Sequence, residues 1–472
     1  MPEAPHQRSG PTARVALRAT RATSHAQSTT NRPLTFPTVS DPSSLNPFRT
    51  LLRHRNFRLF WLGQTLSLIG TWMQTMAEGW LALELSNSAF IVGLVAAAQS
   101  FPVLVLSLPA GHIVDRSDKL KLVRIAQTLL GVQAATLWWV TWSRHVTIAW
   151  LLALATANGV ISAFEIPARQ SLVIELVGRE DLPGAIALNS SGFNLARVVG
   201  PSIGAIVIAQ LGIAWCFGVN ALSYATVLVG LFMIQLPAWM PPEHSVSPLD
   251  GMRAGLRYMR GTPSISALMK LVTVYSVLGV PYLTLMPVVA RDQLHLDARG
   301  YGALLACVGI GGVTGALSLA AIGDRIGRSR LLSAAAYAFS GLLVAFAIVR
   351  EPGAAYAILL VVGFMMIVNN ATANSTLQHL VPNELRGRLM AAYSFVVVGL
   401  SSVVGSILAG SVAHAIGVSW AIGGGGAIMF LYAIWAFETR PELRAIDGER
   451  GTADGGRPPA GVRAPGRGQD GS

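Results

Sequence analysis

The chain has 472 residues, of which 52% are apolar and only 12% are charged, and its mean hydropathy is +0.52. This composition excludes a soluble protein of several domains and indicates that lipid is the main solvent of the chain. The formal net charge of +12 does not indicate nucleic-acid binding, because the basic residues form no single patch and instead occupy the short breaks between apolar segments.

The first segment, residues 1–48, is rich in Arg, Ser, Thr and Pro and contains two acidic residues, Glu3 and Asp41. We interpret it as a disordered cytoplasmic tail, although its composition also loosely resembles an organellar transit peptide. At the other end of the chain, residues 438–472 are rich in Gly, Pro and Arg and are predicted to form a second disordered cytoplasmic tail.

Between these tails, polar breaks separate apolar stretches close to the roughly 20 residues that a helix needs to cross a bilayer. The resulting prediction is twelve transmembrane helices, at 57–83, 89–111, 121–143, 147–166, 185–210, 214–236, 265–289, 301–322, 331–349, 354–377, 389–413 and 418–437. They divide into an N-terminal six-helix bundle at 49–236 and a C-terminal one at 265–437. The polar linker at 237–264 is expected to contain an amphipathic helix on the inner leaflet.

Basic residues orient these spans, because cytoplasmic loops retain Lys and Arg. Every second loop is basic, whereas the opposite loops contain only Arg144, Arg291, Arg299 and Arg350. Both termini are therefore expected on the cytoplasmic side of a bacterial cytoplasmic (inner) membrane. Six tryptophans cluster at the predicted outer ends, where an indole prefers the interface: Trp138, Trp139, Trp142, Trp150, Trp215 and Trp420.

The chain lacks the short motifs of ATP-driven or covalent chemistry, since it has no Walker lysine, no HExxH pair and no GxSxG elbow. We therefore expect no enzymatic activity and no cofactor, and an ion gradient remains as the energy source. Cys216 and Cys307 are expected to be free thiols, and their spacing predicts no metal site. The glycine-rich run 309–315 lies inside an apolar span and is predicted to be a helix-packing face.

An internal duplication supports the division into two halves. Residues 111–119, GHIVDRSDK, resemble residues 320–328, AAIGDRIGR, about two hundred residues later. Residues 176–180 and 380–384 repeat the next cytoplasmic break at a similar offset. We therefore predict an all-α membrane protein made of two pseudo-symmetric six-helix bundles.

These residues carry a family resemblance. The Asp-Arg loops of both halves and the Gly200-Pro201-Ser202-Ile203-Gly204 helix resemble the signature motifs of the major facilitator superfamily, over roughly residues 50–440. Three further segments resemble the bacterial branch that includes the enterobactin exporter and macrolide-type drug:proton antiporters: 70–74, 167–171 with 187–190, and 382–388.

The Asp-Arg loops also depart from the family pattern. Asp118 replaces the usual glycine of the first loop, and Ala320 replaces the leading glycine of the second. These departures are expected to retune the gate without abolishing it.

A carboxylate near a helix end or beside an arginine can serve as a two-state latch between two packings of the cytoplasmic helix ends. The residues assigned to gating are Asp115, Arg116, Arg169, Asp324 and Arg325. The alternative is that these loops only set the orientation of the chain through their positive charge.

An ionisable residue inside a membrane costs about 2.5–3.5 kcal/mol on insertion scales, so those retained there are functional candidates. Glu78, in the outer half of the first helix, and Glu165, near the inner end of the fourth, are the proton-coupling candidates. For Glu165 the alternative is a structural ion pair with Arg169, four residues later. For Glu78 it is exposure to water in an outer vestibule.

The resemblance implies a central cavity lined by the first, fourth, seventh and tenth helices. The candidate cavity residues are Gln64, Ser67, Gln74, Asn158, Tyr275, Tyr282, Asn369, Asn370 and Asn374. Since buried amides also hold membrane helices together, part of this set is expected to serve packing. Pro281 and Pro287 are expected to permit a bend in the seventh helix.

The small residues of the fifth helix predict close approach of another helix. Arg197, Gly200, Pro201 and Gly204 are assigned to this packing, with a direct transport role for Arg197 as the alternative. In the family that the chain resembles, this glycine-proline helix is associated with exporters, which favours outward transport.

The sequence as a whole predicts a secondary active transporter that acts as a monomer by alternating access. Its predicted activity is proton-coupled export of a small organic molecule, drug-like or siderophore-like, with the substrate, protons and the lipid bilayer as its partners. An importer or facilitator of a small metabolite is the alternative. A polytopic membrane enzyme or a non-transporting scaffold is more distant, since acidic clusters and an ordered soluble domain are both missing from the sequence.

Overall fold

The computed structural model describes residues 47–237 and 257–445. From Pro47 onward these residues belong to one compact unit, in which all regular structure among the described residues is helical. Most of the predicted linker and most of both predicted tails lie outside the described residues. Where the C-terminal tail was predicted to begin, the short helix α18 (Pro441–Arg444) instead buries Leu443.

Six long helices lie in the first described range. They are preceded by the short helix α2 (Pro47–Arg53) and are α3 (Arg55–Ser86), α4 (Ala89–Asp115), α5 (Lys119–Trp142), α6 (Ile148–Val177), α7 (Leu182–Leu211) and α8 (Ala214–Met233). Polar side chains and glycines set several of their ends. Asp118 accepts a hydrogen bond from the backbone amide of Lys121, and thus caps α5 in the loop where the family pattern has glycine. Gly178 and Gly212, both with positive φ, end α6 and α7.

The second range also forms six long helical segments, two of which are interrupted. The first comprises α10 (Pro263–Val274), η2 (Tyr275–Gly279), η3 (Val280–Tyr282), α11 (Met286–Val288) and η4 (Val289–Gln293). The others are α12 (Ala298–Ile322) with η5 (Gly323–Arg325), α13 (Arg328–Ile348), α14 (Pro352–Leu380), the series α15 (Asn383–Ser394), η6 (Phe395–Gly405) and α16 (Ser406–Ile416), and α17 (Val418–Thr439). The interruption of the first segment at Pro281 and Pro287 agrees with the predicted bend.

Helix α6 differs most from its predicted length. The prediction ended it at residue 166, but it continues to Val177 through Pro167. The proline removes one backbone hydrogen bond without ending the helix, and the segment that resembled a loop adds about three further helical turns.

Among the described residues, ten helices are long and apolar enough to cross a membrane. Helices α3 and α5 have the necessary length, 32 and 24 residues, but are not among the ten. They contain the buried polar residues Gln64, Gln74 and Glu78 in α3, and Gln127 and Gln133 in α5. Their lower hydropathy therefore reflects polar side chains that face other helices.

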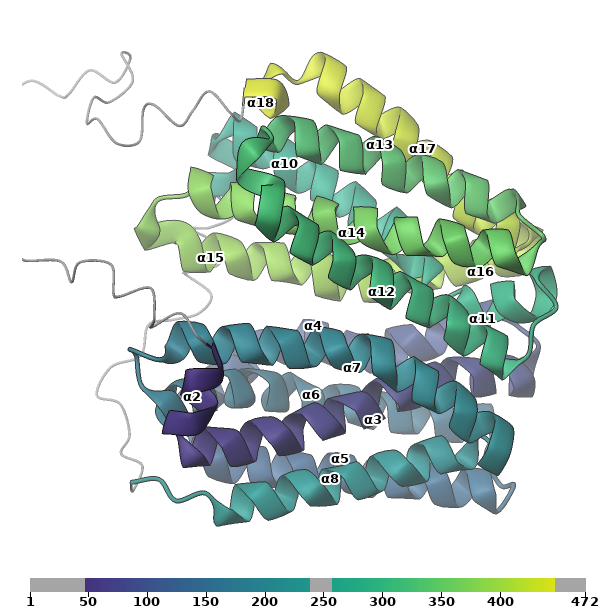
Figure 1. The fold of residues 1–472 in the computed structure, drawn as a ribbon. Coiled ribbons are helices and arrows are strands. Elements are labelled where there is room, and N and C mark those ends of the chain that lie inside the picture. The colour runs from purple at the N-terminus through teal and green to yellow at the C-terminus, as the bar shows by residue number, and fades with distance from the viewer. Residues whose placement is uncertain (1–46, 238–256, 446–472) are drawn as a thin grey trace, which may run out of the picture. The chain divides into compact units, whose positions relative to one another are not determined.

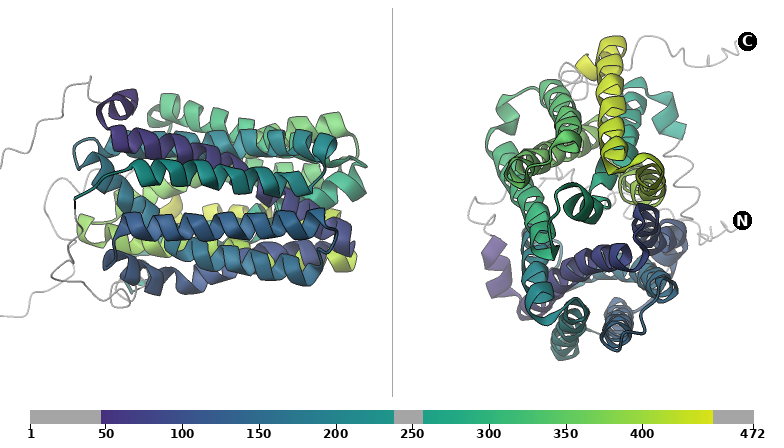
Figure 2. Two further views of the ribbon diagram at one scale, coloured as in Figure 1. Left: turned by 90° about the horizontal axis from the view of Figure 1, so that it is seen from below. Right: turned by 90° about the vertical axis from the view of Figure 1, so that its right-hand side faces the viewer.

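The long helices run roughly parallel, with α2 to α8 below and α10 to α18 above in Figure 1, and the end-on view of Figure 2 shows them side by side. The two groups meet where α4 contacts η6 and α16, where α7 contacts α12, and where α3 contacts α11. Large apolar side chains, such as Leu222 and Leu317, are exposed on the surface. Exposed tryptophans lie at the C-terminal end of α5 and at the N-terminal ends of α6, α8 and α17, as in an interfacial aromatic belt, and Trp435 is exposed near the opposite end of α17.

Candidate functional site

A cavity of about 170 Å³ lies between the two groups of helices. Its walls come from α3, α4 and α7 of the first group, and from α12 and the turn between η3 and α11 of the second. Most of the lining is apolar, and its polar or aromatic members include Trp72, Glu78, Gln99, Arg197, Thr284 and Tyr301. Few polar groups in a largely apolar pocket are typical of small-molecule sites.

A second, larger cavity of about 370 Å³ lies at the helix ends. Its charged groups already have partners, because Arg350 donates to the carbonyl of Ala347 at 3.0 Å and to Ser419 Oγ at 3.1 Å, and Asp292 pairs with Arg291 at 2.6 Å. We therefore place the candidate site in the smaller cavity, where both groups of helices supply the walls.

Glu78 brings a carboxyl group to this cavity from α3. It is 2% exposed, so in this structure it does not lie open to water as in the alternative of an outer vestibule. Gln74, one turn earlier, donates to Glu78 Oε1 at 2.8 Å. The Gln74 amide is itself held by Asn220 Nδ2 of α8, at 2.6 Å, and lies 3.3 Å from Gln133 Oε1 of α5. Three helices thus orient one carboxyl group.

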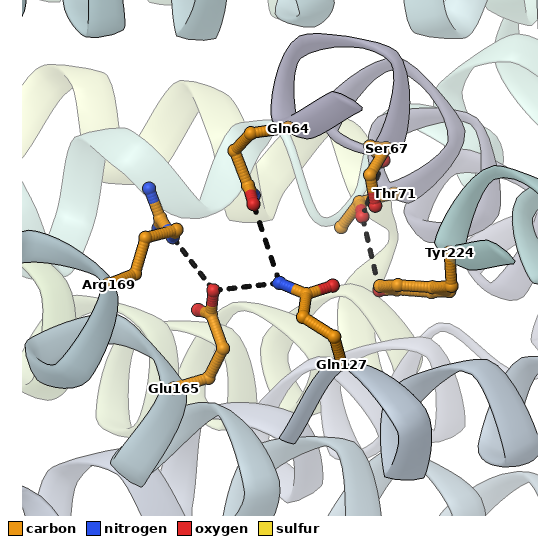
Figure 3. A network of polar contacts seen from close by, with 7 residues as sticks. All are labelled: Gln64, Ser67, Thr71, Gln127, Glu165, Arg169 and Tyr224. Atoms are coloured by element: carbon orange, nitrogen blue, oxygen red, sulfur yellow. Dashed lines mark hydrogen bonds and ion pairs between the residues drawn. The ribbon is translucent and has the colours of Figure 1, made fainter. Parts of the chain in front are cut away.

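Glu165 lies in a separate polar network inside the first group (Figure 3). Arg169 Nε donates to Glu165 Oε1 at 2.8 Å, so the two form the pair that their spacing suggested. Gln127 Nε2 donates to the same oxygen at 3.0 Å and approaches Gln64 Oε1 at 3.4 Å. Figure 3 also shows Ser67 beside Thr71, whose hydroxyl lies 3.3 Å from that of Tyr224. Arg169, assigned to gating, is therefore engaged within its own helix.

The nine candidate cavity residues are not among the described residues that line this cavity. Gln64, Ser67 and Gln74 belong to the networks above, and Asn158 lies just behind the wall, where its Oδ1 accepts from Gln99 at 3.2 Å. The remaining five are on the second group of helices: Tyr275, Tyr282, Asn369, Asn370 and Asn374. Tyr275 donates to the carbonyl of Ala336 at 2.9 Å, as expected of a packing group.

The three asparagines on α14 differ in their contacts. Asn374 Oδ1 accepts from Gln378 at 2.6 Å, and the carbonyl of Asn370 accepts from Tyr393 at 3.3 Å. Asn369 Oδ1 is buried without a hydrogen-bond partner among the described residues. Tyr282 is fully buried, with its hydroxyl 3.9 Å from the sulfur of Met366.

Sequence reasoning missed several lining residues, chiefly Trp72, Gln99, Thr284 and Tyr301. Gln99 had a recognisable signal, since it is an amide in the middle of an apolar span. Tyr301 had none, because its role depends on the stacking of its ring on Trp80, at 5.6 Å between centroids, and on its approach from the other group of helices.

The loop residues assigned to gating lie at the helix ends. Asp115 and Arg116 are exposed at the end of α4, and Lys119 bridges from the carbonyl of Asp115, at 3.4 Å, to Glu175 of α6, at 3.7 Å. Lys119 therefore ties this loop to α6 of the same group. In the second loop, Arg325 is exposed in η5, and the side chain of Asp324 lies outside what the structure describes.

The residues assigned to helix packing divide into two kinds. A Cβ atom on Gly200 would come within 2.6 Å of Trp72 Cβ, and one on Gly204 within 3.0 Å of Met73 Cγ, so the glycines let α7 approach α3 closely. Arg197 and Pro201 line the cavity, and the carbonyl oxygen of Pro201 also packs closely on Gly302 of α12, where a Cβ atom would come within 2.9 Å of it. The glycine run of α12 packs in the same manner, since a Cβ on Gly311 would meet the carbonyl oxygen of Leu360 in α14 at 1.8 Å.

Comparison with known proteins identifies the family of this chain and several of its relatives. The sequence model of the transmembrane secretion effectors matches residues 43–454. The chain is 27% identical to the multidrug efflux pump Tap of Mycolicibacterium fortuitum, over 74% of this chain and 87% of that protein. It is 25% identical to the staphyloferrin A transporter of Staphylococcus aureus, over 60% and 71%. With the enterobactin exporter EntS of Shigella boydii it shares 26% identity, over 57% and 63%.

The fold is also found among solved structures. A bacterial homologue of the human lysosomal transporter Spinster, in an inward-facing and unoccupied conformation, superposes with a TM-score of 0.63 over 87% of this chain and 98% of that chain. Its sequence identity of 12% supports a common fold and no more.

Proposed function

We propose, from the premise that this chain belongs to the transmembrane secretion effector family of the major facilitator superfamily, that it is a proton-coupled exporter of a small organic molecule. Family membership makes it a multi-pass membrane transporter and not an enzyme. Coupling to protons, the outward direction of transport and the class of substrate are what we propose beyond family membership.

The proposed topology has twelve spans in two six-helix bundles, with both termini in the cytoplasm of a bacterial cell and the monomer as the working unit. Six long helical segments between Arg55 and Met233, and six between Pro263 and Thr439, support it. Rocking of one bundle against the other would open the cavity to each side of the membrane in turn.

The observation that carries the proposal is the position of Glu78. It is a buried acid in a helix at membrane depth, and it lies on a cavity wall shared by both groups of helices. A carboxylate there is costly to move through a low-dielectric surrounding, whereas the protonated acid is not. A substrate group that donates to ionised Glu78 would compete with the proton, which links proton entry to substrate exit.

Glu165 is the second proton candidate, and the structure separates the two acids by their partners. Glu78 accepts from an amide, whereas Glu165 is paired with Arg169. Protonation of Glu165 would leave the partly buried guanidinium of Arg169 without its counter-charge, so we assign the coupling proton to Glu78 first.

Export is the proposed direction because relatives of this chain are named an efflux pump and an exporter. Their names also point to drug-like or siderophore-like compounds as the substrate class. A screen in an efflux-deficient bacterial host would identify a compound whose efflux depends on this protein.

With that compound, transport and proton uptake would be measured together in proteoliposomes under an imposed pH gradient. Glu78→Gln should abolish the part of efflux driven by the gradient while leaving exchange down a substrate gradient. Glu84→Gln is the matched control, because Glu84 lies on the same helix but is exposed and accepts from Trp80 at 2.6 Å. Unchanged coupling in both Glu78→Gln and Glu165→Gln would remove the proton assignment.

A further inference from the structure

Arg197 lies in the middle of a membrane helix, where a charged side chain costs free energy. It is midway along the 30-residue helix α7, roughly 22 Å from either end at 1.5 Å per residue. A guanidinium cannot lose its charge in a protein, so at the centre of a membrane helix it needs a partner or a function.

Among the described residues, Arg197 has a ring contact with Trp72 and an electrostatic interaction with Tyr282. Its Cζ atom lies 5.8 Å from the centroid of the Trp72 ring, and no hydrogen bond or ion pair to it occurs within the described ranges. Arg124 is the contrasting case. It also lies over an aromatic ring, that of Phe232, but its guanidinium donates to the carbonyl of Leu231 at 2.8 Å. Arg197 thus retains hydrogen-bond donors that no group among the described residues accepts.

Helix packing does not explain Arg197. The close approach of α7 to α3 is made by Gly200 and Gly204, whose missing side chains leave room for Trp72 and Met73. Arg197 lies one turn before this contact and lines the cavity instead. From the second group of helices, Tyr301 with its stacked ring and Thr284, whose hydroxyl lies 3.0 Å from that of Ser406, line the same cavity.

We propose that Arg197, held over the Trp72 ring, is the binding site for the acidic group of the transported molecule. A planar guanidinium matches a carboxylate with two parallel hydrogen bonds, which is the geometry its free donors offer. This inference rests on the proposed transport function and narrows it, because it makes the substrate an organic anion.

The other groups of the cavity define the rest of such a molecule. Glu78 and Arg197 give the cavity two poles of opposite sign, while Val92, Val95 and Leu305 provide apolar walls. A fitting substrate is an amphipathic organic acid that also has a hydroxyl or amino donor. The acid group binds Arg197, and the donor binds Glu78, where the proposed exchange with a proton takes place.

Salicylate is a suitable probe, because it is an aromatic acid with a hydroxyl donor, and salicylamide is its uncharged counterpart. Binding of radiolabelled salicylate would be measured by equilibrium dialysis with the full-length protein in lipid nanodiscs, with salicylamide as competitor. Arg197→Gln should weaken salicylate binding by roughly ten- to a hundredfold, as expected for loss of a charge-assisted hydrogen bond. Arg197→Lys should weaken it less, since the charge remains but the planar fork is lost.

Arg124→Gln is the matched control and should bind salicylate like the parent, since Arg124 is already hydrogen-bonded at another site. A second measurement needs no variant. Salicylate should slow the reaction of phenylglyoxal with Arg197, read by mass spectrometry, and leave the reaction at the exposed Arg325 unchanged.

Three results would overturn the subsite: no salicylate binding by the parent, equal binding of salicylate and salicylamide, or full affinity in Arg197→Gln. These results are separable from the transport proposal. If the parent exports an organic compound while Arg197→Gln keeps its salicylate affinity, transport stands and the subsite fails. If salicylate binding depends on Arg197 but vesicles show no proton-driven efflux, the subsite stands and the proposed function fails.

Discussion

Replacing Gly93 with alanine tests how closely the two groups of helices pack. Gly93 is on α4, and a Cβ atom there would lie 2.3 Å from the carbonyl oxygen of Ser406 in α16 and 3.3 Å from Gly410 Cα. To restore an ordinary contact of 3.4 Å, α4 and α16 would have to separate by about 1 Å. Backbone lies on both sides of this contact, so no side chain can rotate away to make room.

The expected cost is that of overpacking a well-packed core, about 1–3 kcal/mol. Replacing a glycine with alanine inside a helix also stabilises the helix by about 1 kcal/mol, because alanine has the higher helix propensity. The control must therefore be another helical glycine, so that this stabilisation is the same in both variants. Gly424 in α17 is such a site, because a Cβ there would meet no atom within 4 Å. The two variants should therefore differ in stability by about 1–3 kcal/mol, with Gly424→Ala the more stable.

Thermal unfolding of the detergent-solubilised protein, followed by tryptophan fluorescence, would compare both variants with the parent. Gly93→Ala should unfold at a lower temperature than the parent, and Gly424→Ala at the same or a higher one. Equal unfolding temperatures for the two variants would show that α4 and α16 do not approach as closely as the structure has them.

Two further predictions concern charged pairs. The hydrogen bond from His54, together with the charge of Arg53, holds the pKa of Asp181 below its usual value. This stabilisation of α2 on α7 is therefore complete above the ordinary pKa of an aspartate and is lost as the pH falls through the lowered one. Asp181→Asn should raise amide hydrogen exchange in α2 at neutral pH, and an unchanged rate would contradict this. Arg169→Gln should lower stability by up to about 3 kcal/mol, because Glu165 keeps its bond from Gln127 but loses its counter-charge, and adding Glu165→Gln should restore part of the loss. A double variant as unstable as Arg169→Gln would refute the contribution of this ion pair.

The pattern of apolar and polar residues along the chain was sufficient to predict a membrane transporter. Apolar stretches of membrane-spanning length occur in a simple order, so the membrane fold and the family could be predicted from hydropathy and the loop motifs. Contacts within one helix were also predictable, as with Glu165 and Arg169, which are one turn apart. The C-terminal end of α6 was not predictable, because Pro167 resembles a helix terminator and only its surroundings show that the helix continues.

The lining of the cavity depended on tertiary structure. Which face of each helix meets the cavity is set by the rotation of that helix against its neighbours, and hydropathy does not record this rotation. Asn369 and Tyr275 were therefore reasonable candidates that do not line this cavity, while Gln99 and Tyr301 lie on its wall. Arg197 shows the difference most clearly. The sequence determined that a permanent charge lies in the middle of a membrane helix. Only the packing of α7 on α3 decided that its guanidinium lies over Trp72 and beside the cavity, because the glycines next to it form the close contact between the two helices.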